Sequence, residues 1–226
     1  MNCNPLFGLH SDHLCPVFPG HFLTEKTKNA FLQMQKAALS NQIDLTLASS
    51  FRSFERQRLI WNRKFSGESP VFDYDGSKIA HWSELSDLQK CISILRWSAL
   101  PGASRHHWGT DLDVYSKNKL PLGYQLQLIP EEYCEQGIFH ELTTWLDQNM
   151  VNFGFYRPYA LDLGGVSAES WHLSFYPESS ELLKQISPVQ LLNIYEKYPI
   201  AGLTAITNNI DMLWQRFILN IQEPPQ

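Results

Sequence analysis

The chain has 226 residues, of which 43% are hydrophobic and 18% are charged, so it can bury a core and does not have the composition of a disordered protein. Its formal net charge is -5 and its Lys and Arg residues are scattered. This argues against a nucleic-acid partner, because phosphate binding normally needs a clustered basic face. No apolar run approaches the roughly 18 residues of a membrane span.

The first third of the chain is predicted to form two helices around a short strand. Residues 24–41 and 53–65 carry apolar side chains at helical spacing, and each segment begins with a Thr or Ser that can cap its first turn. Between them, residues 44–49 alternate as a strand does. Residues 67–79 are polar and rich in turn residues, and loops of this kind often border active sites.

The middle of the chain is predicted to alternate helices with short strands. Helical periodicity covers residues 83–97 and 138–151, and residues 130–134 can form a single turn. Strand-like patterns cover residues 109–115 and 170–175. Helices therefore separate strands that are short and unevenly spaced.

The end of the chain is predicted to be entirely helical, over residues 178–186, 188–197 and 203–219. The order of elements argues for an α+β fold rather than a doubly wound sheet. We expect a small, mostly antiparallel sheet flanked by helices, with a C-terminal helical extension.

Three parts of the chain are expected. An irregular N-terminal arm covers residues 1–23, a domain that carries the functional site covers residues 24–176, and a C-terminal helical extension, residues 177–226, packs on that domain. The first residues lack both the basic and the apolar region of a signal peptide, which predicts a cytoplasmic protein.

The four cysteines do not form a CxxC pair. Cys91 lies in an apolar helical pattern and is predicted to be a reduced core thiol. Cys3 and Cys15 could form a disulfide only in an oxidising compartment.

Two segments, residues 104–113 and 169–172, carry the residue types of a metal site. Together they offer His106, an aspartate and His172 as donors for a divalent metal, with Glu169 as a free carboxylate nearby. Three protein ligands plus one water is the arrangement of a catalytic zinc, whereas structural sites are usually closed by four ligands rich in Cys. A carboxylate beside the metal water can remove its proton.

The spacing within these segments constrains how the donors meet. His106 and Asp113 are seven positions apart and would point to opposite faces of one continuous strand, so the chain must turn between them, and Gly109 permits such a turn. Asp111 and Asp113 share a strand face, so spacing alone does not choose between them. Glu169 is expected to precede the strand or to sit at a bulge.

Three other groups of potential ligands are weaker. Residues 140–144 begin like the HExxH zinc helix but have a Thr in place of the second His. His107 is predicted to point away from its neighbour His106. An N-terminal group could form a second zinc site, but its spacing fits no standard finger. Its members are Cys3, His10, His13, Cys15 and His21.

Three motifs in order resemble the VanY-type D-alanyl-D-alanine carboxypeptidases. They are Ser50-Phe51-Arg52-Ser53 with Gln57, then Ser104-x-His106-x-x-Gly109-x-x-x-Asp113, and finally Glu169-x-Trp171-His172. The resemblance covers roughly residues 24 to 176. It implies one zinc ion per chain, held by His106, Asp113 and His172.

The same resemblance implies roles for further residues. Glu169 would be the catalytic base, and Arg52 would hold the substrate or the developing oxyanion, its alternative role being a salt bridge at the start of a helix. Ser104, Gln57 and Trp171 are candidate substrate-binding residues, although core packing is an alternative for the tryptophan.

Three features of the chain depart from the family pattern. The family commonly has Ala at the position of Asp111, so a second carboxylate near the metal could alter substrate choice or metal preference. Phe51 replaces a Tyr of the family. Many relatives act outside the cytoplasmic membrane, whereas this sequence shows no secretion signal.

The resemblance implies a zinc-dependent D,D-carboxypeptidase that removes the terminal D-alanine from peptidoglycan stem peptides or their precursors. Its substrates would be those peptides or other small peptides containing D-alanine. Neighbouring alternatives are a D-Ala-D-Ala dipeptidase and an L-alanyl-D-glutamate endopeptidase. An alternative of another class is a Hedgehog-like zinc-containing binding domain without peptidase activity. Glu169 and Arg52 favour the enzyme, because metal binding alone needs neither. The sequence leaves the peptide, the physiological metal and the oligomeric state open.

Overall fold

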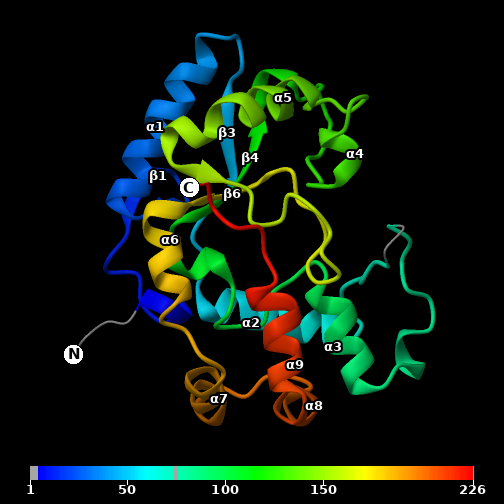
Figure 1. The fold of residues 1–226 in the computed structure, drawn as a ribbon. Helices are drawn as coiled ribbons and strands as arrows, with labels where there is room; N and C mark the ends of the chain where they lie inside the picture. The colour runs from blue at the N-terminus through cyan, green and yellow to red at the C-terminus, as the bar shows by residue number, and fades with distance from the viewer. Residues whose placement is uncertain (1–4, 74–75, 226) are drawn as a thin grey trace.

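The computed structural model describes residues 5–73 and 76–225, and its centre is a four-stranded sheet (Figure 1). The strand order is β3-β4-β6-β5, and every neighbouring pair is antiparallel. The strands are β3 (Leu45–Ser49), β4 (Asp111–Ser116), β5 (Phe155–Tyr156) and β6 (His172–Phe175). This small antiparallel sheet and the helices that flank it confirm the predicted α+β fold.

The two central strands bring the two metal-site segments together. β4 and β6 pair in a register that sets Asp113 opposite His172 and Asp111 opposite Ser174. Both strands are almost completely buried, as central strands of a covered sheet are. Cross-strand partners lie about 4.5–5.5 Å apart at Cβ, so strand pairing alone places two of the predicted ligands beside each other.

Helices α1 (Glu25–Leu39) and α2 (Phe54–Phe65) begin where the sequence predicted. The side chains of Thr24 and Ser53 accept hydrogen bonds from the backbone N–H groups of Thr27 and Arg56. Such caps satisfy amide groups that the first helical turn leaves without a partner. The cap at Ser53 therefore fixes the start of α2 directly after Arg52.

The predicted helix over residues 83–97 is shorter in the structure. A 3₁₀ turn, η2 (Trp82–Glu84), comes first, and α3 (Asp87–Leu95) starts after Ser86. Ser86 and Gln89 form a reciprocal capping box, which specifies a helix start more strongly than apolar periodicity does.

The N-terminal segment is more regular than expected. It contains a 3₁₀ turn, η1 (Pro5–Phe7), and a hairpin of β1 (Cys15–Phe18) and β2 (His21–Leu23). The prediction of a wholly irregular arm was wrong, because Pro19-Gly20 is a turn signal between two short apolar runs. Gly20 has a φ of +81°, which a side chain would disfavour.

The remaining helical elements connect the strands or follow them. Between β4 and β5 lie η4 (Lys117–Lys119), α4 (Pro130–Tyr133), α5 (His140–Asn149) and η5 (Met150–Phe153). After β6 come α6 (Tyr176–Leu183), α7 (Pro188–Lys197), α8 (Leu203–Asn208), α9 (Ile210–Trp214) and the π-helical turn η6 (Gln215–Leu219).

The last predicted helix is interrupted at Asn209. The side-chain amide of Asn209 donates to the carbonyl of Ala205, and the backbone N–H of Asn209 donates to the carbonyl of Ile206. An asparagine that bonds to nearby backbone competes with the helical pattern. Helices α8 and α9 therefore replace the single predicted helix.

Two hydrophobic cores lie in the upper and lower halves of the view in Figure 1. One fills the space between the sheet, α1 and α5. The other joins α2 and α3 to the C-terminal helices, with Trp61, Cys91, Leu191 and Trp214 among its buried members. The C-terminal helices therefore pack on the rest of the chain, and Cys91 is the buried free thiol that was predicted.

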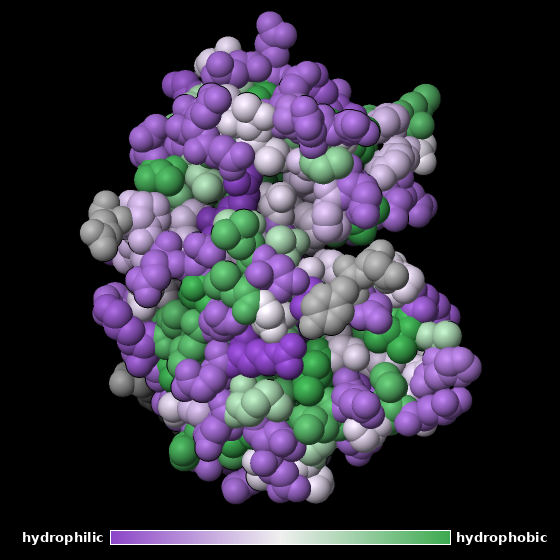
Figure 2. Space-filling model, turned by 45° about the vertical axis from the view of Figure 1, so that its right-hand side comes forward, coloured by the Kyte–Doolittle hydropathy of each residue, from purple (hydrophilic) through white to green (hydrophobic). Residues whose placement is uncertain are grey.

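The surface differs between these two halves. The face in Figure 2 is mostly hydrophilic over its upper part, and apolar side chains gather over the lower part. Across the described ranges, no helix is both long enough and apolar enough to cross a lipid bilayer.

Candidate active site

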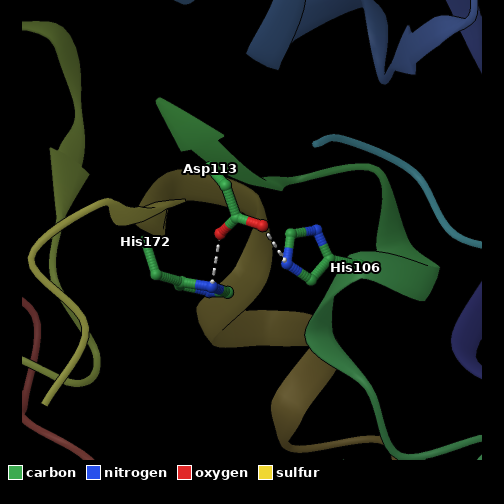
Figure 3. Close-up of side chains that lie close together, drawn as sticks. All are labelled: His106, Asp113 and His172. Carbon is green, nitrogen blue, oxygen red and sulfur yellow. Dashed lines mark ion pairs between the residues drawn. The ribbon is translucent and has the colours of Figure 1, made fainter. Parts of the chain in front are cut away.

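His106, Asp113 and His172 form one compact group of potential metal ligands (Figure 3). Each contributes a donor atom, and the three atoms lie within 4.8 Å of one another. His106 Nε2 is 3.4 Å from one carboxylate oxygen of Asp113, and His172 Nδ1 is 3.2 Å from the other. All three side chains are buried. The structure thus brings together the three residues that the motifs singled out.

A turn at Gly109 allows His106 to reach the sheet. His106 lies in the 3₁₀ helix η3 (Arg105–Trp108), which ends at Gly109 with a φ of +72°. A Cβ at this glycine would lie 2.3 Å from Leu14 Cδ2. The left-handed backbone angle favours glycine at this position, and a side chain would also displace Leu14. The predicted turn between His106 and Asp113 is confirmed.

The donor group fits a zinc ion. Two imidazoles and one carboxylate are the N and O donors of an open catalytic site. Oδ1 of Asp113 is buried, and its ion-pair partner is Nδ1 of His172, another donor atom of the group, so a cation bound here would contact both atoms. Burial alone would raise the pKa of Asp113, but the neighbouring His106 and His172 hold it well below its usual range.

Each histidine is oriented by a partner on its far side. His106 Nδ1 lies 2.9 Å from the carbonyl oxygen of Ser50. Because a carbonyl only accepts, Nδ1 carries the proton and Nε2 presents its lone pair to the group. Burial lowers the pKa of His106, which favours this neutral form.

His172 is held in the same way by Asp111. His172 Nε2 is 3.0 Å from Oδ1 of Asp111, which also accepts from Arg105 Nε at 2.7 Å. Hydroxyl groups of Thr110 and Ser174 donate to the other Asp111 oxygen at 2.9 and 3.0 Å. The Asp111 carboxylate is therefore fully engaged behind His172 and lies outside the ligand group.

Glu169 lies beside the ligand group. It precedes β6, which is one of the two placements that the sequence predicted. A turn in which the His172 N–H donates to the Glu169 carbonyl puts both side chains on the same side. Glu169 Oε2 is 3.5 Å from His172 Nδ1. Burial raises the pKa of Glu169 to about 7, against the opposing effect of His172.

Arg52 reaches the same region from the start of α2. Its backbone N–H donates to the His106 carbonyl, and its guanidinium donates to Gln57 Oε1 at 2.9 Å. No carboxylate lies within 4 Å of this guanidinium in residues 5–73 and 76–225, so the alternative of a helix-start salt bridge is not supported. Gln57 is fully buried and donates to Ala99 O. Gln57 therefore holds Arg52 and is not among the residues that line the cavity. Its role in substrate binding stays a prediction.

A cavity of about 780 Å³ opens onto these groups. Its size lies within the usual range for small-ligand sites, about 300–1,000 Å³. Ser104 and Trp171 line it, as do the three ligand candidates, Glu169 and Arg52. The Trp171 ring also packs on Tyr133, with ring centroids 5.4 Å apart. Both predicted roles of Trp171, pocket wall and core residue, therefore fit its position.

The motifs did not reveal two polar residues of this cavity. Lys64 projects from α2, and Tyr159 places its ring 5.1 Å from that of His172, centroid to centroid. Lys64 follows Gln57 by seven positions, which places both on one face of a helix. This spacing is the signal that could have identified the lysine.

The weaker ligand candidates stay outside the site. His107 Nε2 accepts from the Gly102 N–H, and Nδ1 donates to the Arg52 carbonyl, so both nitrogens are used in backbone contacts. His140 is exposed at the start of α5. His10, His13, Cys15 and His21 form no ligand group in the described part of the chain. Cys3, and with it the possible disulfide, lies outside the described residues.

Comparison with known proteins places the site in a family. The profile of VanY, D-alanyl-D-alanine carboxypeptidase, matches residues 20–178. An uncharacterised protein of Haemophilus influenzae is 33% identical over 122 residues, which are 53% of this chain and 93% of that protein. A D-alanyl-D-alanine carboxypeptidase of Enterococcus faecalis is 27% identical over 142 residues, covering 62% of this chain and 42% of that protein.

Two solved structures share the fold. VanYB in complex with D-alanine-D-alanine has a TM-score of 0.53 at 20% identity, covering 80% of this chain and 87% of that one. A vancomycin-resistance D,D-pentapeptidase VanY variant in complex with Zn(II) has a TM-score of 0.52 at 21% identity, covering 79% and 89%. The family match spans all three motifs and the whole sheet. The chain therefore belongs to the VanY family of D-alanyl-D-alanine carboxypeptidases, as its motifs predicted.

Proposed function

We propose that this protein is a zinc-dependent D,D-carboxypeptidase that removes the terminal D-alanine from peptidoglycan stem peptides or their precursors. The observation that carries the proposal is the open three-donor group with the Glu169 carboxylate beside it, inside a cavity of peptide size. Solved structures with this fold include one with Zn(II) and one with D-alanine-D-alanine.

The metal would be held by His106, Asp113 and His172, one ion per chain. A zinc ion bound there would polarise the scissile carbonyl and lower the pKa of its water ligand to about 7. The hydrogen bond of His106 to Ser50 O and that of His172 to Asp111 fix both rings with a lone pair toward the ion. Such outer partners also raise the basicity of the ligands.

Glu169 would act as the catalytic base. Its carboxylate would accept the proton of the attacking water and pass it to the amine of the leaving D-alanine. Glu169 lies close to the ligand group, and its side chain is only 13% exposed. A pKa near 7 suits this role, because a base works best when its pKa is close to the operating pH.

Arg52 would stabilise negative charge on the substrate, either on the developing oxyanion or on a carboxylate. Its guanidinium is held by Gln57 and interacts electrostatically with Asp113 and Glu169. Removing one oxyanion donor typically costs about 2.7–4 kcal/mol of barrier. Ser104 and Trp171 would contact the peptide from the cavity wall.

Two alternatives act at the same kind of site, and a third is not an enzyme. They are a D-Ala-D-Ala dipeptidase, an L-alanyl-D-glutamate endopeptidase and a Hedgehog-like binding domain. Glu169 and Arg52 both face the cavity, and binding alone would need neither. These two residues therefore favour an enzyme over the binding domain.

Mass spectrometry of products from purified pentapeptide muropeptides tests the proposal. We expect loss of one D-alanine per stem and no loss after zinc is chelated. Release of the dipeptide or cleavage after L-alanine would identify one of the other enzymes. An intact pentapeptide with zinc-loaded protein would contradict peptidase activity on this substrate.

A further inference from the structure

The cavity is also lined by Lys64, a cation that the mechanism above does not use. Lys64 lies in the last turn of α2 and lines the same cavity as Arg52 and Glu169. Its ammonium group donates to Ser98 Oγ at 2.6 Å. The side chain is half-buried, and its partner Ser98 lines the same cavity.

Lys64 lacks a counter-ion within the part of the chain that the structure describes. No carboxylate oxygen of those residues lies within 4 Å of its ammonium nitrogen. Burial, and then the charge of Arg52, lower the pKa of Lys64 to about 8. A partly buried ammonium without an anion is costly, and an anionic ligand group would offset that cost.

Arg52 and Lys64 are held by different partners, Gln57 and Ser98. Arg52 interacts electrostatically with Asp113, one of the proposed ligands, and with Glu169. The strongest electrostatic neighbours of Lys64 are Arg52 and Glu169. Lys64 and Arg52 thus line the same cavity, and the Lys64 ammonium is held by Ser98 rather than by a group of the ligand site.

A peptide that ends in D-alanine presents two groups that a cation can stabilise close together. The scissile carbonyl must lie at the metal, and the terminal carboxylate follows it by one residue. The cavity wall also includes the apolar Ile60, one turn before Lys64 on α2, and the buried Leu95 and Leu100. An alanine methyl group and a carboxylate would therefore both find complementary surroundings.

We propose that Lys64, with Ser98, forms the subsite that binds the terminal carboxylate of the substrate, which leaves Arg52 to stabilise the oxyanion. This inference rests on the proposed carboxypeptidase function and names the substrate class: peptides with a free C-terminal carboxylate. A compact ammonium group suits a single carboxylate as a point charge, and the Ser98 hydroxyl holds it in place.

The test compares a peptide that ends in D-Ala-D-Ala with its C-terminal amide, using the zinc-loaded protein. The unmodified protein should cleave the free acid with a kcat/KM at least about 10-fold above that of the amide, since one charge-assisted contact is worth roughly 1.5–3 kcal/mol. In Lys64→Met this acid-to-amide ratio should fall close to one, while cleavage of the amide changes less than about threefold.

Arg63→Met is the matched control, because it removes one positive charge from the preceding position of the same helix, which is exposed. It should leave the ratio unchanged. Lys64→Arg keeps the charge and should retain part of the preference for the acid. The ratio does not depend on the folded fraction, so it remains informative if Lys64→Met lowers stability.

Several results would overturn the subsite. They are an unchanged ratio in Lys64→Met, an equal loss on both peptides, or an unmodified protein that cleaves acid and amide equally well. If the unmodified protein cleaves neither peptide, the proposed function fails instead. Calorimetric binding of both peptides to zinc-loaded Glu169→Gln protein then still tests the role of Lys64. This protein should bind the acid more tightly than the amide, and the additional change Lys64→Met should abolish that difference.

Discussion

Nε2 of His172 lies 3.0 Å from Oδ1 of Asp111, a carboxylate that Arg105 holds from another side at 2.7 Å. The contact directs the opposite ring nitrogen, Nδ1, toward Asp113. Asp111 occupies a position where the family commonly has Ala, and the sequence suggested an effect on metal preference or substrate choice. In the structure it supports a proposed ligand from behind.

The first prediction concerns this support. Asp111→Asn keeps the size of the side chain but removes the charge behind His172. We expect zinc affinity to fall about 10–100-fold, as is typical when a carboxylate partner of a ligating His is lost. Competition with a chromophoric chelator would measure it. Asp211→Asn, an exposed change on α9, is the control, and an equal affinity in both variants would contradict the role of Asp111.

The second prediction separates a proposed metal ligand, His172, from a buried histidine outside the ligand group, His107. His172→Ala should lose most of the bound zinc, because one of three ligands is deleted. His107→Ala should keep about one zinc per chain, since both nitrogens of His107 bond to backbone groups. Metal content of the purified variants by mass spectrometry decides the point. Similar zinc loss in the two variants would remove the ligand assignment.

The third prediction tests how Arg52 is positioned. Gln57→Met removes the acceptor that holds the guanidinium, and kcat/KM should fall roughly 10–100-fold because catalysis is sensitive to displacements of about 1 Å. Zinc content should stay unchanged. Gln35→Met is a matched control, since Gln35 also donates to a backbone carbonyl, that of Leu45, but lies outside the cavity. Equal losses of activity would show that the effect is general.

The fourth prediction concerns the C-terminal helices. Trp214 is 4% exposed and belongs to the core shared with α2 and α3. Trp214→Ala should lower the free energy of unfolding by about 3–5 kcal/mol, the usual cost of deleting a large buried aromatic side chain. Val189→Ala, at a position that is 68% exposed, should cost less than about 0.5 kcal/mol. Urea unfolding of both variants would show whether the C-terminal segment folds with the rest of the chain.

Local sequence signals predicted most of the fold and the centre of the site. Cap residues such as Ser53 and apolar periodicity located the helices, because both act within one or two turns. His106, Asp113, Glu169 and His172 could be proposed together because their motifs keep fixed spacings. The distances between them depend on the β4–β6 register and on the turn at Gly109.

Features that depend on tertiary contacts could not be predicted in the same way. Asp111 shares a strand face with Asp113, so its spacing also fits a metal ligand. Only the tertiary structure shows that its carboxylate pairs with Arg105 instead. The motifs suggested that Gln57 contacts the substrate, and they did not show that its side chain bonds to Arg52 and to the carbonyl of Ala99. Lys64 has no motif, and its importance comes from the cavity that α2 and α3 form together with the sheet.

The central claim is that the three-donor group and Glu169 act together in hydrolysis. The most direct measurement is cleavage of a D-Ala-D-Ala pentapeptide by zinc-loaded Glu169→Gln protein, followed by mass spectrometry, with zinc content measured on the same sample. We predict about one zinc per chain, an unchanged melting temperature and a kcat lower by about 10²–10⁴-fold, the contribution typical of a general base. Full activity in this zinc-loaded variant would contradict the claim.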